Sequence, residues 1–508
     1  MTTLHDTYWQ AVDAIERDCR VADWRAGDVD LWPLARQDLF LDLFHGQGGD
    51  TAPPPPRFVV RAASSLATPL ANLWKSRRDL SHWLPRPQRA GAVLLGDGVS
   101  LDCIDGAWRD RYGEPIVAAL ARRGCSTSIM QPGNLARLPW ARPTFAANTI
   151  AAWGALTAAL TRGSVPTLPD HAAVTAHLDR AGITAPSLAT ARLARRARVV
   201  AAQAAVFERI LRHVRPRMAF VVTHYAGLGH AFALACRRCG VLCVDLQHCP
   251  QGSAHRGYRW PVMPPDGYTT LPGLFWTWSA AEAAGIERWT ETLQRPWHRA
   301  INGGHSQIAD FAGIEAEAAW NAAFDAIAGV PAARELLVAL QPIGGRRTVW
   351  EALAAAIASA PPDWRWWIRR HPASTLAQDG DYAALLSLRS ANVVVEPAAS
   401  LPLPVLVRRM GALVSLDSGA AGEAAAFGVP AFFLSDEARG PFADLIARGA
   451  ARVVDTDKLV GAIARLPPAP ARSPVAPMPR IEDTLDVIER IADDYARLAS
   501  ARHRQGRA

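Results

Sequence analysis

Short apolar runs alternate with longer helical segments through most of this 508-residue chain. Residues 91–96 (GAVLLG) have the composition of a buried strand, and residues 187–214 have the alanine and arginine spacing of a helix. Strands separated by helices pair in parallel through right-handed crossovers. The alternation therefore predicts an α/β fold built on parallel sheets.

The expected strands form two series. The first series comprises residues 91–96, 126–130, 218–224, 241–248 and 274–279. The second series comprises residues 335–340, 364–370, 393–397, 412–416, 430–435 and 451–455. We expect two facing, doubly wound α/β domains. The expected division is a helical N-terminal extension (1–88), a first Rossmann-like domain (89–295), a second Rossmann-like domain (296–480), and a C-terminal helix and tail (481–508). Ligands of such folds bind at the carboxyl ends of the strands.

Composition excludes several classes of protein. Half of the residues are hydrophobic and 20% are charged, which excludes a largely disordered chain. No apolar run reaches the roughly 20 residues of a membrane span. The formal charge is +8, carried by scattered arginines and only two lysines, so no basic patch for nucleic acid is expected. The start lacks a secretory signal, which predicts a cytoplasmic protein with reduced thiols. The positive charge is also compatible with peripheral contact with the inner membrane.

Polar residues follow two strands of the second series. At the carboxyl ends of residues 364–370 and 412–416, or shortly after them, lie Arg369, Arg370, His371, Ser415, Ser418, Gly419 and Glu423. Cationic side chains and the free N–H groups at a helix start bind phosphate, and a carboxylate one to two turns further can reach a ribose diol. The alternative is an ordinary turn, with Ser418 as a helix cap and Glu423 in solvent. In their order along the chain, the residues favour a nucleotide-phosphate site.

Three motifs resemble those of bacterial GT-B glycosyltransferases of capsule and lipopolysaccharide assembly. They are RRHP (369–372), SLDSGAAGEAAAFGVP (415–430) and LQH (246–248). The similar families are the Kdo- and sialyltransferase-like enzymes and the related CDP-glycerol glycerophosphotransferases. The resemblance implies that His371 contacts the donor phosphate, that Ser415 or Ser418 binds it, and that Glu423 holds the ribose. It also implies the GT-B architecture, with residues 89–295 as the acceptor-side domain and residues 296–480 as the nucleotide-sugar-binding domain. One departure is Gln247-His248-Cys249, where many relatives read Gln-His-Gly.

Acidic residues follow the first strand of the first series. Asp97, Asp102 and Asp105 come after residues 91–96, where Gly96 and Gly98 would permit an open loop. The pair Asp97-Gly98 resembles an acidic-glycine motif that supplies the catalytic carboxylate in sialyltransferase-like families. Such a carboxylate can deprotonate an acceptor hydroxyl. The alternative is that Asp97 caps a turn and that the other two lie on a solvated loop.

Two histidines also end strands of the first series. His224 and His248 are candidate catalytic residues, although single histidines in cores are more often structural. Gln247, His255 and Arg256 are candidate acceptor-side residues, together with Asp102 and Asp105. Cys236, Cys239, Cys243 and Cys249 are expected to be buried thiols, because their spacing would scatter them over a helix, a strand and a loop.

Together these observations predict a metal-independent glycosyltransferase without a cofactor. Its donor would be a nucleotide-sugar, with a CMP-activated sugar as one candidate, and its acceptor a bacterial surface glycan or a lipid-linked glycan. Protein cations and dipoles would neutralise the leaving nucleotide in place of a metal. Two alternatives stay open: a sugar-nucleotide epimerase of the same architecture, and an inactive assembly partner of other glycan enzymes.

Overall fold

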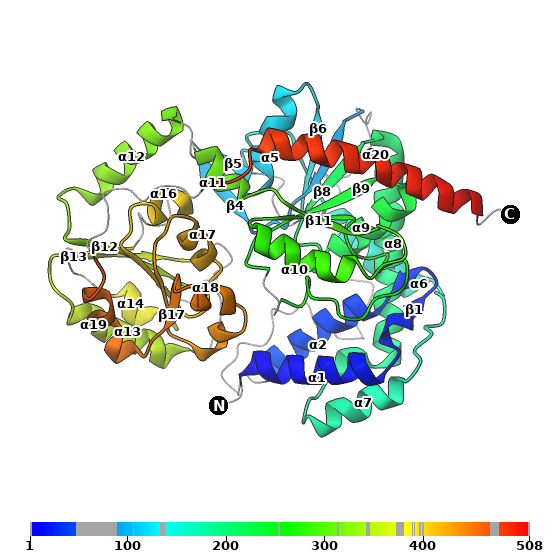
Figure 1. The fold of residues 1–508 in the computed structure, drawn as a ribbon, viewed down its shortest axis with the longest axis horizontal. Helices are drawn as coiled ribbons and strands as arrows, with labels where there is room; N and C mark the ends of the chain where they lie inside the picture. The colour runs from blue at the N-terminus through cyan, green and yellow to red at the C-terminus, as the bar shows by residue number, and fades with distance from the viewer. Residues whose placement is uncertain are drawn as a thin grey trace. The chain divides into compact units, whose positions relative to one another are not determined.

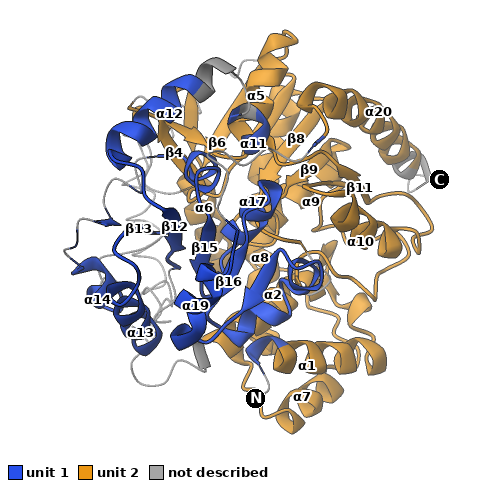
Figure 2. Cartoon of the chain, turned by 60° about the vertical axis from the view of Figure 1, so that its left-hand side comes forward, with its two compact units in different colours: residues 1–5, 48–55, 307–478 blue, residues 6–47, 56–306, 479–508 orange. Residues whose placement is uncertain are grey.

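In the computed structural model, the chain forms two compact units (Figure 2). One unit comprises residues 1–5, 48–55 and 307–478, and the other comprises residues 6–47, 56–306 and 479–508. The structure describes residues 3–46, 89–104, 106–132, 138–251, 255–311, 314–341, 346–371, 380–388, 390, 392–395, 398, 401–467 and 477–505. The linker prolines of residues 53–56 and most of residues 467–479 lie outside the described residues.

The unit of residues 307–478 is built on a parallel sheet of six strands within the described residues. The strand order is β14-β13-β12-β15-β16-β17, and every pairing is parallel. The strands are β12 (Arg334–Ala339), β13 (Trp364–Arg369), β14 (Val393–Val394), β15 (Ala412–Ser415), β16 (Ala431–Phe433) and β17 (Ala451–Val453). The six strands predicted in the second series are therefore all present, several of them shorter than expected.

Helices cover both faces of this sheet (Figure 1). They are α12 (Ile314–Ala328), α13 (Arg347–Ala358), α14 (Ala383–Leu386), α16 (Leu403–Val407), α17 (Ala420–Ala426), α18 (Ala443–Ala447) and α19 (Leu459–Ala464). Along β12, Leu336 and Val338 pack with α13, α14 and α19, whereas Leu337 and Ala339 pack with α12, α16, α17 and α18. Because successive strand residues point to opposite faces, the apolar run forms two cores. The expected doubly wound arrangement is confirmed.

The second unit contains a parallel sheet of seven described strands, in the order β11-β10-β9-β8-β3-β6-β7. The strands are β3 (Ala92–Leu95), β6 (Thr127–Gln131), β7 (Thr144–Ala146), β8 (Met218–Val222), β9 (Leu242–Leu246), β10 (Leu274–Thr277) and β11 (Arg299–Asn302). Its helices are α5 (Gly113–Arg122), α6 (Asn148–Leu160), α7 (His171–Arg180), α8 (Thr190–Val214), α9 (Gly229–Cys239) and α10 (Ala280–Thr290). This sheet is the second parallel α/β layer that the sequence predicted.

Two features of this unit differ from the sequence expectation. β11 pairs in parallel with β10, so residues 299–302 belong to the seven-stranded sheet although the predicted domain boundary lay at 295/296. β4 (Leu101–Ile104) and β5 (Ala107–Asp110) form an antiparallel ribbon where an open loop was expected. The ribbon was missed because its alternation covers only four residues per strand, too short to give a clear periodic signal.

The chain ends pack as helices, as expected. α1 (Leu4–Asp18) and α2 (Trp32–Gly46) flank a short hairpin of β1 (Arg25–Ala26) and β2 (Val29–Asp30). Arg36 forms a buried 3.1 Å ion pair with Glu16 and stacks 4.1 Å over the ring of Trp260, which fixes α2 against the loop after β9. Residues 47–88 of the predicted extension lie outside the described residues.

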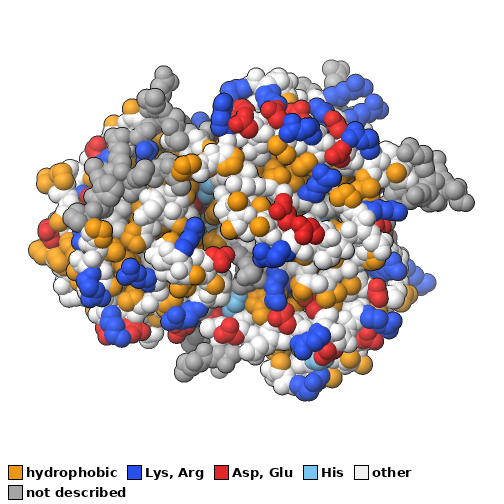
Figure 3. All heavy atoms as spheres, in the orientation of Figure 1, with side chains coloured by type: hydrophobic (Ala, Val, Ile, Leu, Met, Phe, Trp, Pro, Cys, Tyr) orange, Lys and Arg blue, Asp and Glu red, His pale blue; other side chains and the backbone are white. Residues whose placement is uncertain are grey.

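The C-terminal helix α20 (Ile481–Gln505) lies against α5, α9 and β9. Arg122 of α5 contacts Glu482 at 2.7 Å, and Arg217 contacts Asp493 at 3.1 Å. None of the helices described is long and apolar enough to cross a membrane. On the face seen in Figure 3, basic and acidic side chains are interspersed among the described residues, as the scattered arginines predicted.

Candidate functional site

In the seven-stranded sheet, the predicted residues lie at the topological switch point, between β3 and β8, where successive strands begin to be added on the other side of the sheet. From β3 the chain proceeds to β6 and β7 on one side, and from β8 it proceeds to β9, β10 and β11 on the other. The loops after the neighbouring strands β3 and β8 therefore lead away from each other, which is where doubly wound sheets bind ligands. Asp97 follows β3, and Thr223 and His224 follow β8.

Asp97 closes the turn after β3. Its Oδ1 accepts the backbone N–H groups of Val99 (2.8 Å) and Ser100 (2.7 Å), and its Oδ2 accepts the Ser100 hydroxyl (2.7 Å). A longer bond of 3.4 Å joins Thr223 Oγ1 to Oδ2 across the two strand ends. The turn-capping alternative thus describes the local geometry of Asp97, and the side chain remains half-buried rather than enclosed.

A second carboxylate, Asp110, lies buried behind Asp97. Asp110 accepts hydrogen bonds from Gly113 N (2.7 Å), Tyr112 N (3.2 Å) and Gln131 Nε2 (2.6 Å). Burial raises the pKa of Asp110 to about 7, and the charge of Asp97 adds to this effect against the hydrogen bonds, which lower it. Gln131 Oε1 accepts from the backbone N–H of Gly98 at 3.0 Å, so it connects the two acidic positions.

Gly96 is required by this close packing. A Cβ at Gly96 would overlap the side chains of Gln131 and Asp110. Gly98 has a φ of +74°, in the left-handed region that glycine adopts without strain. The two glycines predicted to permit an open loop instead permit a tight turn over a buried polar cluster.

His224 is fully buried. Its Nδ1 lies 2.9 Å from Oδ1 of the buried Asp245, which also accepts the His224 backbone N–H at 3.2 Å. Oδ2 of Asp245 accepts the hydroxyl of Tyr258 at 2.8 Å. His224 is thus the interior member of a polar network beneath the strand ends, and its enclosure favours a positioning role over direct contact with a substrate.

His248 follows β9 and lies nearer the surface. Its Nε2 is 2.9 Å from the hydroxyl of Tyr225, and its carbonyl accepts the hydroxyl of Tyr112 at 3.0 Å. Burial by itself lowers the pKa of His248, but the adjacent Cys249, together with Asp97 and Asp245, raises it to about 9. The imidazole is therefore cationic at neutral pH.

The three acceptor-side candidates beside His248 have different roles. Gln247 is buried; its Nε2 donates to Glu282 (2.6 Å) and to the Cys249 carbonyl (2.9 Å), so it fixes the turn. His255 Nε2 lies 3.7 Å from Cys249 Sγ. Arg256 Nε donates to Gln37 of α2 at 2.5 Å, and its guanidinium lies 5.5 Å from the Tyr225 ring centre. His255 and Arg256 thus share one cluster with His248.

The remaining acidic candidates are separate from that cluster. Asp102 is on β4 and is almost fully buried, where Arg111 Nη2 lies 2.9 Å from its Oδ1. The expectation of a solvated loop is wrong for Asp102, because the ribbon buries it and the arginine neutralises it. Asp105 lies outside the described residues.

In the six-stranded sheet, the topological switch point lies between β12 and β15: β13 and β14 extend the sheet on one side, and β16 and β17 extend it on the other. Gln341 follows β12; its Oε1 accepts the backbone N–H of Asp417 at 3.0 Å, and its amide contacts the Asp417 carboxylate. Ser415, at the end of β15, is fully buried and accepts the backbone N–H of Ser418 at 3.2 Å. The Ser418 hydroxyl accepts the N–H of Ala420 at 3.3 Å. These side chains therefore form a hydrogen-bonded cluster at the switch point of the sheet.

Arg369 ends β13 beside this switch point. It is 8% exposed, and its Nη1 donates to the carbonyl of Ala398 (2.7 Å) and to that of Leu401. Its charge is therefore directed at the carbonyl groups of its own unit. Arg370 and His371 come next in the chain and are both half-buried, which leaves them the more accessible of the three predicted phosphate-binding residues.

Glu423 lies on α17, the seven-residue helix that begins after Gly419. Glu423 is 3% exposed, so the alternative of a solvated surface carboxylate is wrong. Gly419 and Ser418 are half-buried at the start of that helix. Their arrangement after β15 follows the order that the sequence predicted.

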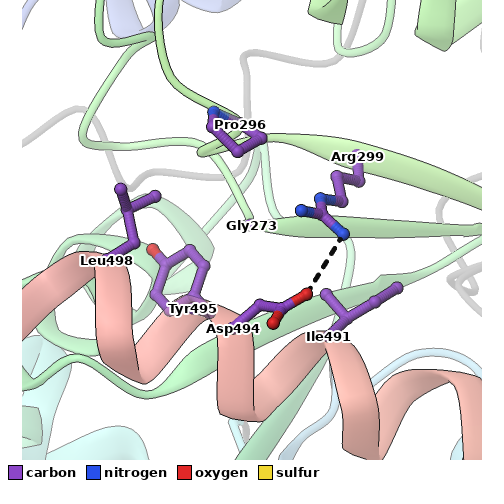
Figure 4. A pocket seen from close by; sticks show the side chains of 7 residues that line it. All are labelled: Gly273, Pro296, Arg299, Ile491, Asp494, Tyr495 and Leu498. Carbon is purple, nitrogen blue, oxygen red and sulfur yellow. Dashed lines mark ion pairs between the residues drawn. The ribbon is translucent and has the colours of Figure 1, made fainter.

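One cavity lies apart from all of these residues. It has a volume of about 260 Å³ and is formed by α20 and the edge of the seven-stranded sheet (Figure 4). Its lining residues are Gly273, Pro296, Arg299, Ile491, Asp494, Tyr495 and Leu498. Arg299 and Asp494 face each other across it at 3.7 Å. Within the described residues, no group of three His, Cys, Asp or Glu side chains is arranged to hold a metal ion.

No protein-family model matches the sequence, and no curated protein matches it either. Among solved structures, the chain is similar to the UDP-GlcNAc 2-epimerase of Neisseria meningitidis bound to UDP-GlcNAc, with 14% identity and a TM-score of 0.48 over 78% of this chain and 98% of that one. The enzyme of the same name from Methanocaldococcus jannaschii has 13% identity and a TM-score of 0.47 over 78% and 98%. The glycosyltransferase SnogD of Streptomyces nogalater has 15% identity and a TM-score of 0.41 over 80% and 100%. The activities in these names are those of the other proteins.

Sequence reasoning missed several members of both clusters. Tyr225 adjoins a predicted histidine, and Cys249 was noted as a departure from Gln-His-Gly and expected to be a buried thiol, whereas it is partly exposed. Gln341 directly follows a predicted strand, and this position was a usable signal. Asp110 gave no signal, because only the unexpected β4–β5 ribbon returns it to the end of β3.

Proposed function

We propose that this protein is a glycosyltransferase that uses a nucleotide-sugar donor. The observation that carries the proposal is the coincidence, in both sheets, of the topological switch point with a cluster of polar side chains. Switch points of doubly wound sheets are where nucleotides and related ligands bind. Two such sites in one chain suit a reaction with two substrates.

In this proposal the six-stranded sheet binds the donor. Ser418 and the accessible pair Arg370 and His371 would contact its phosphates, and the buried Glu423 would hold the ribose. Arg369 is less suited to the phosphate contact than Arg370 and His371, because its Nη1 already donates to two carbonyl groups. A neutralising set of cations and hydrogen-bond donors stabilises the charge that builds up on a departing nucleotide.

The seven-stranded sheet supplies acid–base chemistry in the same proposal. Asp97 is the candidate base, and an acceptor hydroxyl would replace the long Thr223 bond on its Oδ2. The cationic His248, whose pKa is raised to about 9, would balance negative charge near the acceptor. A surface glycan as the acceptor stays a prediction from the sequence resemblance.

A binding experiment with a matched control tests the donor site. The full chain is titrated calorimetrically with CMP, CDP, UDP and GDP, and one of them should bind. Ser418→Ala should weaken that binding by about 10-fold or more, since a hydrogen bond to a charged group contributes roughly 1.5–3 kcal/mol. Ser435→Ala is the control, because Ser435 caps a turn after β16 in the same way, by accepting from Glu437 N at 3.2 Å, but lies outside the switch point. Equal affinity in both variants, or no binding of any nucleotide, would contradict the donor site.

A sugar-nucleotide epimerase is the second candidate. Burial raises the pKa of Asp417, against the hydrogen bond from Gln341, so this carboxyl can hold a proton nearer neutrality at the donor-side switch point. Such a group suits proton transfer on the donor sugar itself. The assay that separates the two candidates follows the donor by chromatography: isomerisation without an acceptor indicates the epimerase, and acceptor-dependent nucleotide release indicates the transferase.

A further inference from the structure

Cys249 lies in a cluster of polar side chains that the proposed reaction does not use directly. Its sulfur is 3.7 Å from His255 Nε2 and 3.8 Å from the hydroxyl of Tyr225. The thiol is partly exposed, unlike the buried Cys236 and Cys243. Reactive cysteines occur in such partly exposed, electropositive surroundings.

The hydrogen-bond geometry assigns the proton positions. The backbone N–H of Gly257 donates to His255 Nδ1 at 3.1 Å, so Nδ1 carries no proton. The ring proton therefore lies on Nε2, the atom that faces Cys249 Sγ. His255 consequently acts as a hydrogen-bond donor to the sulfur.

The tyrosine completes a second donor path. The Tyr225 hydroxyl lies 2.9 Å from His248 Nε2 and 3.8 Å from Cys249 Sγ. When His248 Nε2 carries a proton and donates it to the Tyr225 oxygen, the hydroxyl proton of Tyr225 is left for the sulfur. A thiolate is the form of cysteine that accepts from both Tyr225 and His255.

The charged groups around the sulfur come from several elements. Arg256, on the loop after β9, and His248 are cationic, while Asp97 after β3 and Asp245 on β9 act on His248. Burial raises the pKa of the Cys249 thiol, but the charge of His248, the hydrogen bond with Tyr225 and the charge of Arg256 lower it below its ordinary value. The thiolate and the His248 imidazolium stabilise each other as one ion pair, and the donor position of His255 Nε2 adds to this effect.

We propose that Cys249 is held as a thiolate and is a modification site at which peroxides form a sulfenic acid. The thiolate sulfur attacks one oxygen of hydrogen peroxide, the O–O bond breaks, and an S–O bond forms. The sulfur is oxidised by two electrons and the peroxide is reduced, while the hydroxide that leaves takes a proton from the solvent to become water. The step removes the negative charge that helps to keep His248 protonated. Oxidation of Cys249 would therefore alter the charge of the candidate acid–base cluster.

Alkylation kinetics test the thiolate without any assay of activity. The full chain is treated with iodoacetamide at pH values from 6 to 8, and peptide mass spectrometry follows each cysteine. The exposed Cys103 is the internal reference. Because an ordinary thiol loses roughly tenfold of its thiolate per pH unit below a pKa of about 8.5, the ratio of the Cys249 rate to the Cys103 rate should rise by about 30-fold or more between pH 8 and pH 6. A ratio independent of pH would overturn the proposal.

Two variants and a second reagent make the test specific. Tyr225→Phe and His248→Gln each remove one donor path and should abolish most of that rise, with melting temperatures measured on the same samples. Peroxide followed by dimedone should label Cys249 in the wild type before Cys103, and Cys249→Ser should lose that label. Labelling of Cys103 first would count against the site. Only the expected fall of turnover after oxidation rests on the proposed function. Unchanged turnover with Cys249 labelled would contradict the role of His248 in that function and not the modification, whereas the absence of any transfer in the unlabelled protein would contradict the function itself.

Discussion

The carboxyl edges of the two sheets hold their charged side chains in different ways. At the edge of the seven-stranded sheet, Asp97, His248 and Cys249 are partly accessible; Thr223 contacts Asp97, and the Tyr225 hydroxyl lies between His248 and Cys249. At the edge of the six-stranded sheet, the predicted phosphate ligand Arg369 is buried and bound to two backbone carbonyls. The difference shows that a charged residue at a strand end can be reached by a ligand only where the surrounding loops leave its side chain partly exposed.

The largest effect is expected for a substitution of Asp97, at the edge of the seven-stranded sheet. Asp97→Asn keeps an oxygen that can accept from Val99 N and Ser100 N, so the turn should survive. Loss of the base should lower acceptor-dependent turnover by about 10²- to 10⁴-fold. Steady-state kinetics and melting temperature are measured on one preparation. Wild-type turnover would mean that Asp97 is only a turn cap.

A pH series tests the buried carboxyl behind that edge. Burial raises the pKa of Asp110 to about 7, whereas in the unfolded chain it is about 3.9. The folded state then binds more protons between these values, so the contribution of Asp110 to stability is fully present below about pH 4 and is lost as the pH rises from about 4 to about 7. The expected loss is about 4 kcal/mol, at about 1.4 kcal/mol per unit.

Asp110→Asn supplies the control for this series. It removes the titration, so the part of the pH dependence between about pH 4 and pH 7 should flatten in urea unfolding, whatever the variant's absolute stability. An unchanged slope would show that Asp110 is ionised in the folded protein.

Arg369 and Arg370, at the edge of the six-stranded sheet, allow a buried and a more accessible arginine to be compared directly. Arg369→Met should destabilise the protein by about 2–4 kcal/mol, because two buried carbonyls lose their donor. Arg370→Met is expected to change stability by less than about 1 kcal/mol, while it weakens nucleotide binding. Urea unfolding and calorimetric titration of both variants decide this. The opposite pattern would make Arg369 the phosphate ligand.

The smallest expected effect is at Glu423. Glu423→Gln preserves the shape of a side chain that is 3% exposed, and it should weaken nucleotide binding by about 10- to 100-fold through loss of a charge-assisted bond to ribose. A deoxyribonucleotide is the matched ligand control, because it should bind both proteins with similar affinity. If the wild type does not discriminate between the two ligands, Glu423 does not bind the ribose.

Local signals in the sequence predicted the strands well and the short elements poorly. Residues 364–370 and 412–416 are long apolar runs beside clear helical segments, and they became β13 and β15 with ends shifted by a residue. The ribbon of residues 101–110 was missed, because each of its strands contains only four residues. Two parallel sheets and helical ends could be predicted; the boundary near residue 300 could not, since β11 is identified only by its pairing with β10.

For the candidate site, the sequence by itself determined which polar residues end the parallel strands, since strand ends are set by local hydrophobicity. Asp97, His248 and Ser418 could be named for that reason. Only the tertiary structure decided which of the residues at strand ends are accessible and which are internal. His224 and Arg369 are internal because residues distant in the chain bury them and pair with them: Asp245 for His224, and the carbonyls of Ala398 and Leu401 for Arg369. Strand order, burial and hydrogen-bond partners depend on contacts between distant segments, and these contacts leave no periodic signal in the sequence.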